Sequence, residues 1–428
     1  MFGNKRDGVA RKDEMYKSEN MRTAPDKAAC VLETGRLDVT YSSDGDLPIF
    51  GFGERNNPRR SFLFVSHVLG RHIPVSPAVM RAAFTRMADT IPADLPGPVV
   101  MTGMAETAVG LGAGVHDAWI ARTGREDAVF VSTTRAQLGG PLLTTFREEH
   151  SHASDHLVHL PQHPVDLEML RGAQTLVMVD DEASSGDTFR NLAAGLVNAG
   201  LDRIAHVHTA VLTDWSGPAG DRLLPHRPDI AVTRGALVRG SYRWTPAPMA
   251  PVRTLPDADL LRQGAVRPFR RDDDGRLGRS IRSACAMPKG LCEAIGPKPA
   301  RILVIGTGEH VWEPFLLAEA LEQLGHDVRF GSTTRSPILP GHAILRGYVF
   351  RDHEGLGITN YLYNVDPNSV DRVILCVDTA LTAIDPALLA ALGSDVVEGA
   401  VFHDRRDLAE LTRNVAPATK FVLEAAGQ

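Results

Sequence analysis

Two adjacent aspartates and the small residues after them form the stretch of this sequence best suited to chemistry. Asp180 and Asp181 follow the apolar run Leu176–Val179, which is typical of a buried parallel strand. Apolar residues then recur at helical spacing from Phe189 to Val197. Between the acids and that helix lies a small-residue loop that includes Ser184, Ser185, Gly186, Asp187 and Thr188. Ligands of α/β proteins bind where a parallel strand meets the next helix, so this order predicts a ligand site.

The chemistry of this site suits a ribose 5-phosphate. Small residues let the backbone approach a ligand, and N–H groups at a helix N-terminus bind phosphate. The carboxylates of Asp180 and Asp181 can accept hydrogen bonds from two vicinal sugar hydroxyls. Asp187 is out of place beside a phosphate, so we expect it to point outward, cap the helix or contact a metal ion. The alternative is a chance strand and turn with structural acids.

The segment Val177–Phe189 resembles the signature with which type I phosphoribosyltransferases bind 5-phosphoribosyl-1-pyrophosphate (PRPP). The resemblance implies that Asp180 and Asp181 hold the ribose hydroxyls and that Ser184 through Thr188 cradle the 5′-phosphate. It also implies that a nitrogenous base displaces pyrophosphate from the ribose C1, as in orotate phosphoribosyltransferases. The expected cofactor is Mg²⁺, held mainly through PRPP and pyrophosphate rather than by a protein metal site.

Two earlier strand ends are candidates for the pyrophosphate side. The strand Pro98–Met101 leads into Thr102, Gly103 and Met104, which fit the first loop of the resembled family. The strand Ala128–Val131 leads to Arg135, whose guanidinium can bind pyrophosphate oxygens in bidentate fashion. The alternative for Arg135 is a solvated surface residue.

The interval 144–156 corresponds to the mobile hood of type I enzymes, which closes over PRPP. It supplies Arg147, His150 and His152 as candidate phosphate and acid–base groups. Together with Glu148 and Glu149, the histidines leave two alternatives open, a solvated loop and a transition-metal site.

The whole chain resembles proteins that join a phosphoribosyltransferase domain to a C-terminal TRSP domain. That domain is named for a tetrapeptide that stands here as Thr334–Pro337. The block 55–74 also resembles that family, which adds Arg59, Arg60 and Arg71 to the candidate site residues, although a charged turn is the alternative for this block. Arg335 is a further candidate. Such proteins occur in tellurite-resistance and stress-response gene clusters, which implies a context rather than a substrate.

Composition shifts predict the domain limits. Residues 1–36 lack periodicity and are expected to form a flexible tail. Alternating strand and helix patterns over 37–246 predict a Rossmann-like parallel sheet of the type I phosphoribosyltransferase class. Residues 247–298 are rich in Pro, Arg and Asp and predict a linker or loosely packed connection, and 299–428 form the second α/β domain, the TRSP domain.

The second domain also repeats features of the first. Ser132–Arg135 recurs as Ser332–Arg335, Thr102-Gly103 as Thr307-Gly308, and Val177–Asp181 as Leu375–Thr379, in the same order. We therefore predict that the C-terminal domain is a decayed copy of the first, with chance similarity of short strands as the alternative. The segment 380–385 lacks glycine, so chemistry is assigned to the first domain.

Composition restricts the functional classes. The 428 residues suffice for two domains, and 43% hydrophobic with 23% charged residues is typical of soluble globular proteins. A net charge of −6 without a basic stretch argues against direct nucleic-acid binding. Four cysteines form no disulfide framework, and no long apolar run or leader pattern occurs, so a cytoplasmic protein without a membrane span is expected.

The sequence thus predicts a pentosyl-transferring enzyme with PRPP and a small-molecule base as partners. Whether it forms a homo-oligomer stays open, as does the identity of the base. A non-catalytic regulator that binds PRPP or a nucleotide is one alternative. An enzyme that hydrolyses or phosphorolyses a nucleoside in the same pocket is another.

Overall fold

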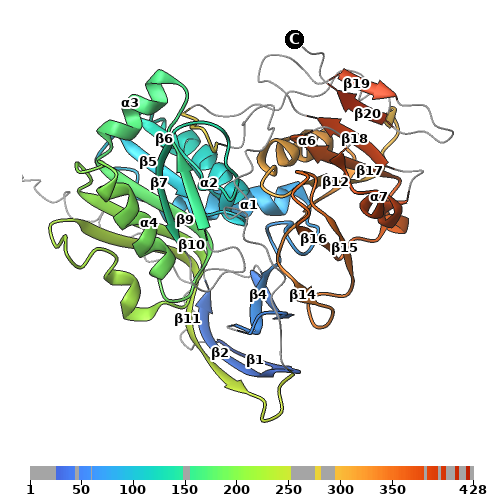
Figure 1. Ribbon diagram of the computed structural model, residues 1–428, viewed down its shortest axis with the longest axis horizontal. Coiled ribbons are helices and arrows are strands. Elements are labelled where there is room, and N and C mark those ends of the chain that lie inside the picture. The colour runs from blue at the N-terminus through green and yellow to red at the C-terminus, as the bar shows by residue number, and fades with distance from the viewer. Residues whose placement is uncertain are drawn as a thin grey trace, which may run out of the picture.

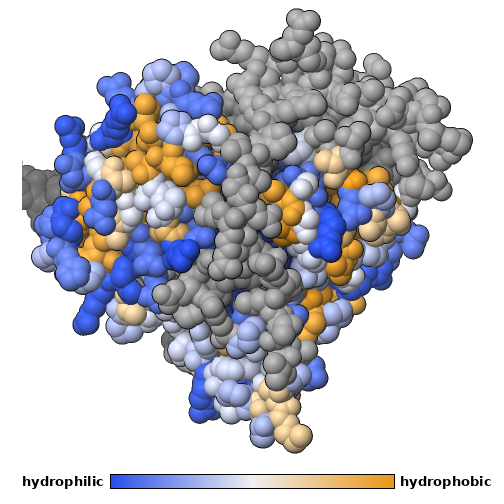
Figure 2. Space-filling model, in the orientation of Figure 1, coloured by the Kyte–Doolittle hydropathy of each residue, from blue (hydrophilic) through white to orange (hydrophobic). Residues whose placement is uncertain are grey.

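The chain builds two large sheets in neighbouring halves, with a smaller sheet between them (Figure 1). The computed structural model describes residues 26–43, 48–58, 60–147, 155–251, 275–280, 295–379 and 383–393, and the backbone of strands within 397–401, 410–413 and 421–424. In those residues no helix is long and apolar enough to cross a membrane. On the face shown in Figure 2, hydrophobic residues of the first half are interspersed with polar ones.

The sheet of the first half has the strand order β1-β2-β11-β10-β9-β5-β6. Its members are β1 (Asp26–Leu32), β2 (Gly35–Ser43), β5 (Val99–Gly103), β6 (Ala128–Phe130), β9 (Thr175–Ala183), β10 (His206–Asp214) and β11 (Ala231–Pro246). The strands from β11 to β6 run parallel, whereas β2 lies antiparallel to both β11 and β1. All parallel carboxyl ends therefore meet at one edge, where a ligand site is expected.

Four helices accompany this sheet: α1 (Pro77–Asp89), α2 (Ala108–Thr123), α3 (Pro164–Gly172) and α4 (Asp187–Asn198), with a 3-10 turn η1 (Gly217–Asp221). Helix α1 begins after Ser76, whose hydroxyl accepts a hydrogen bond from the Val79 N–H. Helix α2 packs closely on β5. A Cβ at Gly103 would lie only 2.2 Å from the Ala108 carbonyl oxygen, so glycine permits this approach. The hairpin β7 (Leu142–Arg147) and β8 (Asp155–His159) contacts α4.

The second half repeats the strand order of the first. Its sheet is β13-β12-β17-β18-β20-β19, formed by β12 (Arg301–Gly306), β13 (Asp327–Ser332), β17 (Arg372–Val377), β18 (Val397–Val401), β19 (Glu410–Arg413) and β20 (Phe421–Glu424). The order β13-β12-β17-β18-β20 matches β6-β5-β9-β10-β11, and both series are parallel. The predicted internal repeat is supported by this topology.

The remaining elements of the second half fit the same scheme. Helix α6 (Trp312–Gln323) follows β12 as α2 follows β5, and α7 (Pro386–Leu392) comes after β17 as α4 comes after β9. The hairpin β15 (Gly347–Arg351) and β16 (Thr359–Tyr363) precedes η3 (Pro367–Ser369) and occupies the chain position of the hairpin β7–β8. Isolated backbone bridges also occur at equivalent places in the two halves, since Thr134 pairs with Leu157 of β8 and Thr334 pairs with Tyr361 of β16.

The two halves exchange short segments. The backbone at Val75 pairs with Phe330 of β13 in both directions, with N···O distances of 2.7 and 3.0 Å. Conversely, Arg279 pairs with Phe130 of β6 in both directions at 2.8 and 2.9 Å. Each exchanged segment starts at a glycine with positive φ, Gly70 or Gly275, whose missing Cβ would collide with the phenylalanine ring it faces.

The exchange corrects two predicted limits. Residues 275–280 are not a loose connection, because Arg276 and Arg279 are each only 1% exposed and their backbone pairs with β6. Residues 26–36 are not a flexible tail, because they form β1 and begin β2, with Cys30 and Leu32 buried. Residues 275–280 are ordered by pairing with distant residues of β6, whereas β1 pairs with the adjacent β2, which in turn pairs with the distant β11. The rest of the predicted division stays a prediction.

The two halves also contribute side chains to one hydrophobic core and strands to one small sheet. One hydrophobic cluster runs from the first sheet to Trp312, Phe315 and Phe330, and the Phe84 ring lies 5.2 Å from the Phe315 ring. The small sheet joins β3 (Phe50–Arg55) and β4 (Phe62–Ser66) of the first half to β14 (Ile338–Leu339) of the second. The halves therefore form one structural unit.

Arg71 is the central polar contact between the halves. Its guanidinium is buried and donates to the carbonyl oxygens of Glu106, Gly308 and Thr333 at 2.6 to 2.7 Å. It also pairs with the Glu106 carboxylate at 3.3 Å. Loss of the guanidinium would leave these buried acceptors without their donor.

We predict that Arg71→Met lowers the free energy of unfolding by about 3–5 kcal/mol, because it breaks a buried ion pair. The matched control is Arg36→Met, which removes an exposed pair with Asp38 and should change stability far less, because solvent screens that pair. Urea unfolding followed by circular dichroism measures both. Equal effects of the two substitutions would contradict the role of Arg71 as the central polar contact between the halves.

Candidate active site

A pocket opens at the carboxyl end of β9, between the two halves. Three groups of residues line it: the β9 end and the loop after it, the ends of the neighbouring strands, and residues of the small sheet and second half. From β9 and α4 come Asp180, Asp181, Glu182, Ala183, Ser184, Gly186, Thr188 and Phe189. From elsewhere come Arg55, Arg60, Leu63, His72, Ala105, Glu106, Thr107, Arg135, Thr334 and Ser336. Most residues of the predicted acidic pair and loop thus share one cavity.

The acidic pair lies on the floor of this pocket. The strand β9 is buried up to Val179, so Asp180 is the first partly exposed residue at its end. The Asp181 N–H donates to the Asp180 carboxylate at 2.9 Å. Burial raises the pKa of Asp181, although a hydrogen bond to Asp180 acts in the opposite direction. Next to the pair, Glu182 is neutralised by Arg60 at 2.5 Å.

The charge of Asp187 is accounted for locally. It is the first residue of α4, pairs with Arg190 one turn on, and accepts the Ser185 hydroxyl at 2.6 Å. Ser185 and Asp187 are absent from the pocket lining, whereas Ser184, Gly186 and Thr188 are part of it. Of the three roles expected for Asp187, the structure favours a helix-terminal carboxylate turned from the pocket.

The first loop predicted over Thr102–Thr107 lines the pocket only in its second part. Thr102 and Gly103 belong to β5, and Met104 is buried, so none of these three lines the pocket. The lining residues are the next three, Ala105 to Thr107. The strand is longer than its apolar pattern suggested because Thr102 and Gly103 continue the backbone pairing with β9.

Arg135 lines the pocket and is not a solvated surface residue. Its side chain is 6% exposed and donates to the Asp155 and Ala105 carbonyl oxygens at 3.0 and 3.2 Å. Two of the other predicted arginines lie elsewhere. Arg71 joins the halves without lining the pocket, and Arg335 forms a buried pair with Glu354 at 3.1 Å.

The hood prediction stays largely outside the structure. His150, His152, Glu148 and Glu149 lie outside the described residues, as does Arg59. Arg147 is 76% exposed, pairs with Asp155, and does not line the pocket. The described residues contain no cluster of His, Cys, Asp or Glu arranged to hold a metal ion.

Several pocket residues were missed by sequence reasoning. Thr334 and Ser336 come from the second half, where the Thr334 backbone is paired with Tyr361 in both directions at 2.7 and 2.9 Å. His72 is buried, and burial together with the neighbouring Arg71 and Arg55 lowers its pKa to about 3. The Thr-Arg-Ser-Pro tetrapeptide and the block 55–74 were the available signals, but neither indicates which side chain faces the pocket.

The comparisons agree with this arrangement. Residues 49–241 match the family model described as phosphoribosyl transferase, and residues 273–392 match the model described as a TRSP domain C-terminal to that transferase. The chain belongs to the phosphoribosyl transferases that carry a C-terminal TRSP domain. It is a transferase of the phosphoribosyl kind, and its first half has the α/β fold with a parallel sheet expected from the sequence.

Solved structures of other phosphoribosyltransferases are similar to part of this transferase. Adenine phosphoribosyltransferase from Rhodothermus marinus is 18% identical, with a TM-score of 0.28, over 46% of this chain and 93% of that one. The Leishmania donovani adenine enzyme is 13% identical (TM-score 0.29; 44% and 76% covered). The Francisella tularensis orotate enzyme is 13% identical (TM-score 0.26; 44% and 80% covered). Comparison with curated proteins gave no match.

We predict that Asp181→Asn stabilises this transferase near neutral pH. Because burial raises the pKa of Asp181 above the usual value of an aspartate, its ionised form is less favourable in the folded than in the unfolded chain. The gain should be a Tm increase on the order of 2 °C, and it should vanish as pH falls through the raised pKa.

The control is Asp229→Asn, since pairing with Arg227 lowers the pKa of that exposed carboxyl. Its substitution should not stabilise at any pH. Thermal unfolding of both variants between about pH 4 and pH 8 makes the comparison. An Asp181→Asn protein with an unchanged or lower Tm at the upper end would contradict the inferred burial of charge.

Proposed function

We propose that this transferase moves the phosphoribosyl group of PRPP to a nitrogenous base and releases pyrophosphate. The observation that carries the proposal is the convergence of Asp180, Asp181, the Ser184–Thr188 loop and Arg135 on one pocket. These groups complement the diol, the 5′-phosphate and the pyrophosphate of a single ligand. In the reaction the C1–N bond forms, the C1–O bond to pyrophosphate breaks, and the base loses a proton.

The ribose 5-phosphate end is assigned to β9 and α4. The carboxylates of Asp180 and Asp181 accept the two ribose hydroxyls, which offsets the cost of their burial when the ligand is bound. The 5′-phosphate meets the backbone N–H groups at the start of α4, a helix of 12 residues whose N-terminus favours anions. Ser184 and Thr188 add hydroxyl donors within the same lining.

The pyrophosphate end is assigned to Arg135 and the backbone of 105–107. A cation there stabilises the negative charge that grows on the leaving group. Glu106 lines the same region, but its carboxylate pairs with Arg71 at 3.3 Å and accepts a hydrogen bond from the Arg335 N–H at 3.4 Å. These contacts direct its charge toward the junction of the halves.

Mg²⁺ fits this site through the chemistry of its donors. Mg²⁺ prefers oxygen ligands and usually keeps substrate phosphates and water around it, with one or two carboxylates. Asp180 and Asp181 offer carboxylates in the pocket, although no group in the described residues forms a separate metal site. When bound, the ion would neutralise pyrophosphate charge.

We assign the acceptor base to the part of the pocket lining that is not assigned to the ribose, the 5′-phosphate or the pyrophosphate. Pyrophosphate departs from one face of C1, so the base nitrogen approaches from the other. The remaining lining includes Arg55, Leu63 and His72 from the first half and Ser336 from the second. Since the pKa of His72 is about 3, its ring is neutral and can both donate and accept a hydrogen bond. This wall suits a planar base with a hydrogen-bonding edge.

We predict that wild-type protein binds PRPP in the presence of Mg²⁺ and that the double variant Asp180→Asn with Asp181→Asn binds it at least about 100-fold more weakly, because two charged acceptors are lost. Isothermal titration calorimetry measures the affinity. Asp229→Asn, which lies outside the pocket lining, should bind like wild type. Unchanged affinity in the double variant would refute the assigned ribose site.

Pyrophosphate release separates an enzyme from a regulator. Incubation of the protein with PRPP, Mg²⁺ and adenine, hypoxanthine or orotate should release pyrophosphate with at least one base above the rate without base. Tight PRPP binding without release for any base would favour a PRPP-sensing protein over the proposed transfer to these bases.

A further inference from the structure

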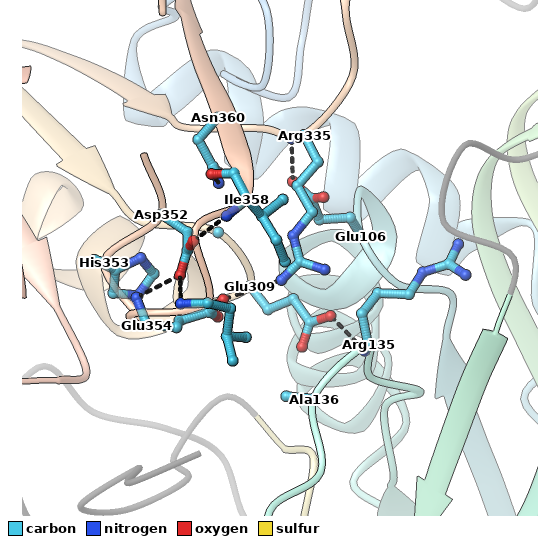
Figure 3. A network of polar contacts seen from close by, with 12 residues as sticks. Glu106, Arg135, Ala136, Glu309, Arg335, Asp352, His353, Glu354, Ile358 and Asn360 are labelled. Carbon is cyan, nitrogen blue, oxygen red and sulfur yellow. Dashed lines mark hydrogen bonds and ion pairs between the residues drawn. The ribbon is translucent and has the colours of Figure 1, made fainter. Parts of the chain in front are cut away.

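Each half of the molecule has a Thr-Thr-Arg loop, 133–135 in the first and 333–335 in the second, that is contacted by a glutamate of the other half. From the second half, Glu309 accepts the Thr134 hydroxyl at 2.5 Å and the Arg135 N–H at 2.7 Å. From the first half, Glu106 accepts the Arg335 N–H at 3.4 Å. Figure 3 shows both glutamates between the two loops, with the Arg135 side chain extending away from Glu309. The contact at Arg135 is the shorter and has a second hydrogen bond beside it.

The two loops are otherwise held alike within their own halves. The Thr133 N–H donates to the Gly103 carbonyl oxygen at 3.0 Å, and the Thr333 N–H donates to that of Gly306 at 3.0 Å. The hydroxyls of Thr133 and Thr333 accept an N–H of the adjacent first loop at 2.7 and 2.8 Å. Other contacts also come from outside each half, since Arg71 donates to the Thr333 carbonyl oxygen and the Ser132 N–H donates to that of Gly275. The glutamate contact adds a further restraint, and at the first-half loop it acts on Thr134 and Arg135 themselves.

The surroundings of Glu309 favour the ionised form of its buried carboxylate. It is 4% exposed, and its carboxylate lies 3.7 Å from the Arg276 guanidinium. Burial alone would raise its pKa, but Arg276 and Arg335, with the hydrogen bonds from Thr134 and Arg135, outweigh burial and lower the pKa. An ionised carboxylate makes stronger hydrogen bonds than a neutral acceptor, so two donors from adjacent residues fix the loop firmly.

The outcome differs between the two arginines. Arg335 is buried in the pair with Glu354, away from the pocket. Arg135 lines the pocket, and its position follows from the backbone at Thr134–Arg135, which Glu309 holds. A displacement of about 1 Å at such a group is enough to lower catalysis strongly.

We propose that Glu309 of the TRSP domain is a positioning residue for the transferase site, which sets the Thr134–Arg135 backbone so that Arg135 meets pyrophosphate. This inference rests on the proposed function, because Arg135 is assigned to pyrophosphate there.

The test compares two ligands that share the pocket. Titration calorimetry with Mg²⁺-pyrophosphate reports on Arg135, and titration with ribose 5-phosphate reports on Asp180, Asp181 and the α4 loop. Glu309→Gln keeps size but loses charge. It should weaken Mg²⁺-pyrophosphate binding about tenfold, the loss of one strong contact, and leave ribose 5-phosphate binding within about twofold of wild type.

Matched variants separate positioning from general stability. Glu354→Gln removes a buried carboxylate of the same domain that pairs with Arg335, and it should leave both affinities as in wild type. If Glu309→Gln does not fold, Thr134→Ala removes one of the two donors and should weaken pyrophosphate binding alone, whereas Thr134→Ser should restore it.

Three results would overturn the inference. The first is unchanged pyrophosphate binding in folded Glu309→Gln and Thr134→Ala proteins. The second is an equal loss of both ligands, which would make Glu309 a structural residue only. The third is wild-type protein that binds neither PRPP nor pyrophosphate, which overturns the proposed function as well and is recognised before any variant is made.

Discussion

The exchange of two short segments between the halves is the constraint on which the rest of the structure depends. Without Gly70–Val75 and Gly275–Arg279, the strands β13 and β6 would end their sheets with unpaired N–H and C=O groups beside the core. Buried backbone groups must be paired, and open sheet edges invite wrong pairing. Each half supplies the strand-like segment that the other needs, so neither sheet is complete alone.

The location of the pocket follows from this exchange. The residue after Gly70 is Arg71, and the residue after Gly275 is Arg276, so each exchanged segment places a guanidinium at the junction of the halves. Arg71 binds Glu106 and Gly308, while Arg276 pairs with Asp378 at 3.0 Å. Buried cations of this kind bring carboxylates to the same place. The strand ends that carry chemistry therefore meet at the junction, and Thr334 and Ser336 reach a pocket whose floor belongs to the other half.

Sequence reasoning succeeded where the signal was local. The strand, turn and helix from β9 to α4 were predictable because these elements follow one another directly along the chain. The repeat was predictable because the matching motifs keep the same order along the chain even where individual residues differ. Arg71 could not be placed, since Gly308 and Thr333, two of its acceptors, lie 237 and 262 residues away. Thr102 and Gly103 were misplaced because small polar residues suit a loop as well as a strand end, and only pairing with β9 decides between them.

The two copies of the acidic strand end differ in how their carboxylates are stabilised, with Asp378 at the position of Asp180 and Thr379 at the position of Asp181. At the end of β17, Asp378 is buried, but the hydrogen bond from His353 and the charge of Arg276 outweigh burial and hold its pKa well below the usual range. At the end of β9, burial instead raises the pKa of Asp181. The second half has satisfied its carboxylate with its own side chains and gains stability from it. Under the proposed function, a ribose diol would stabilise the Asp181 charge, which burial makes unfavourable.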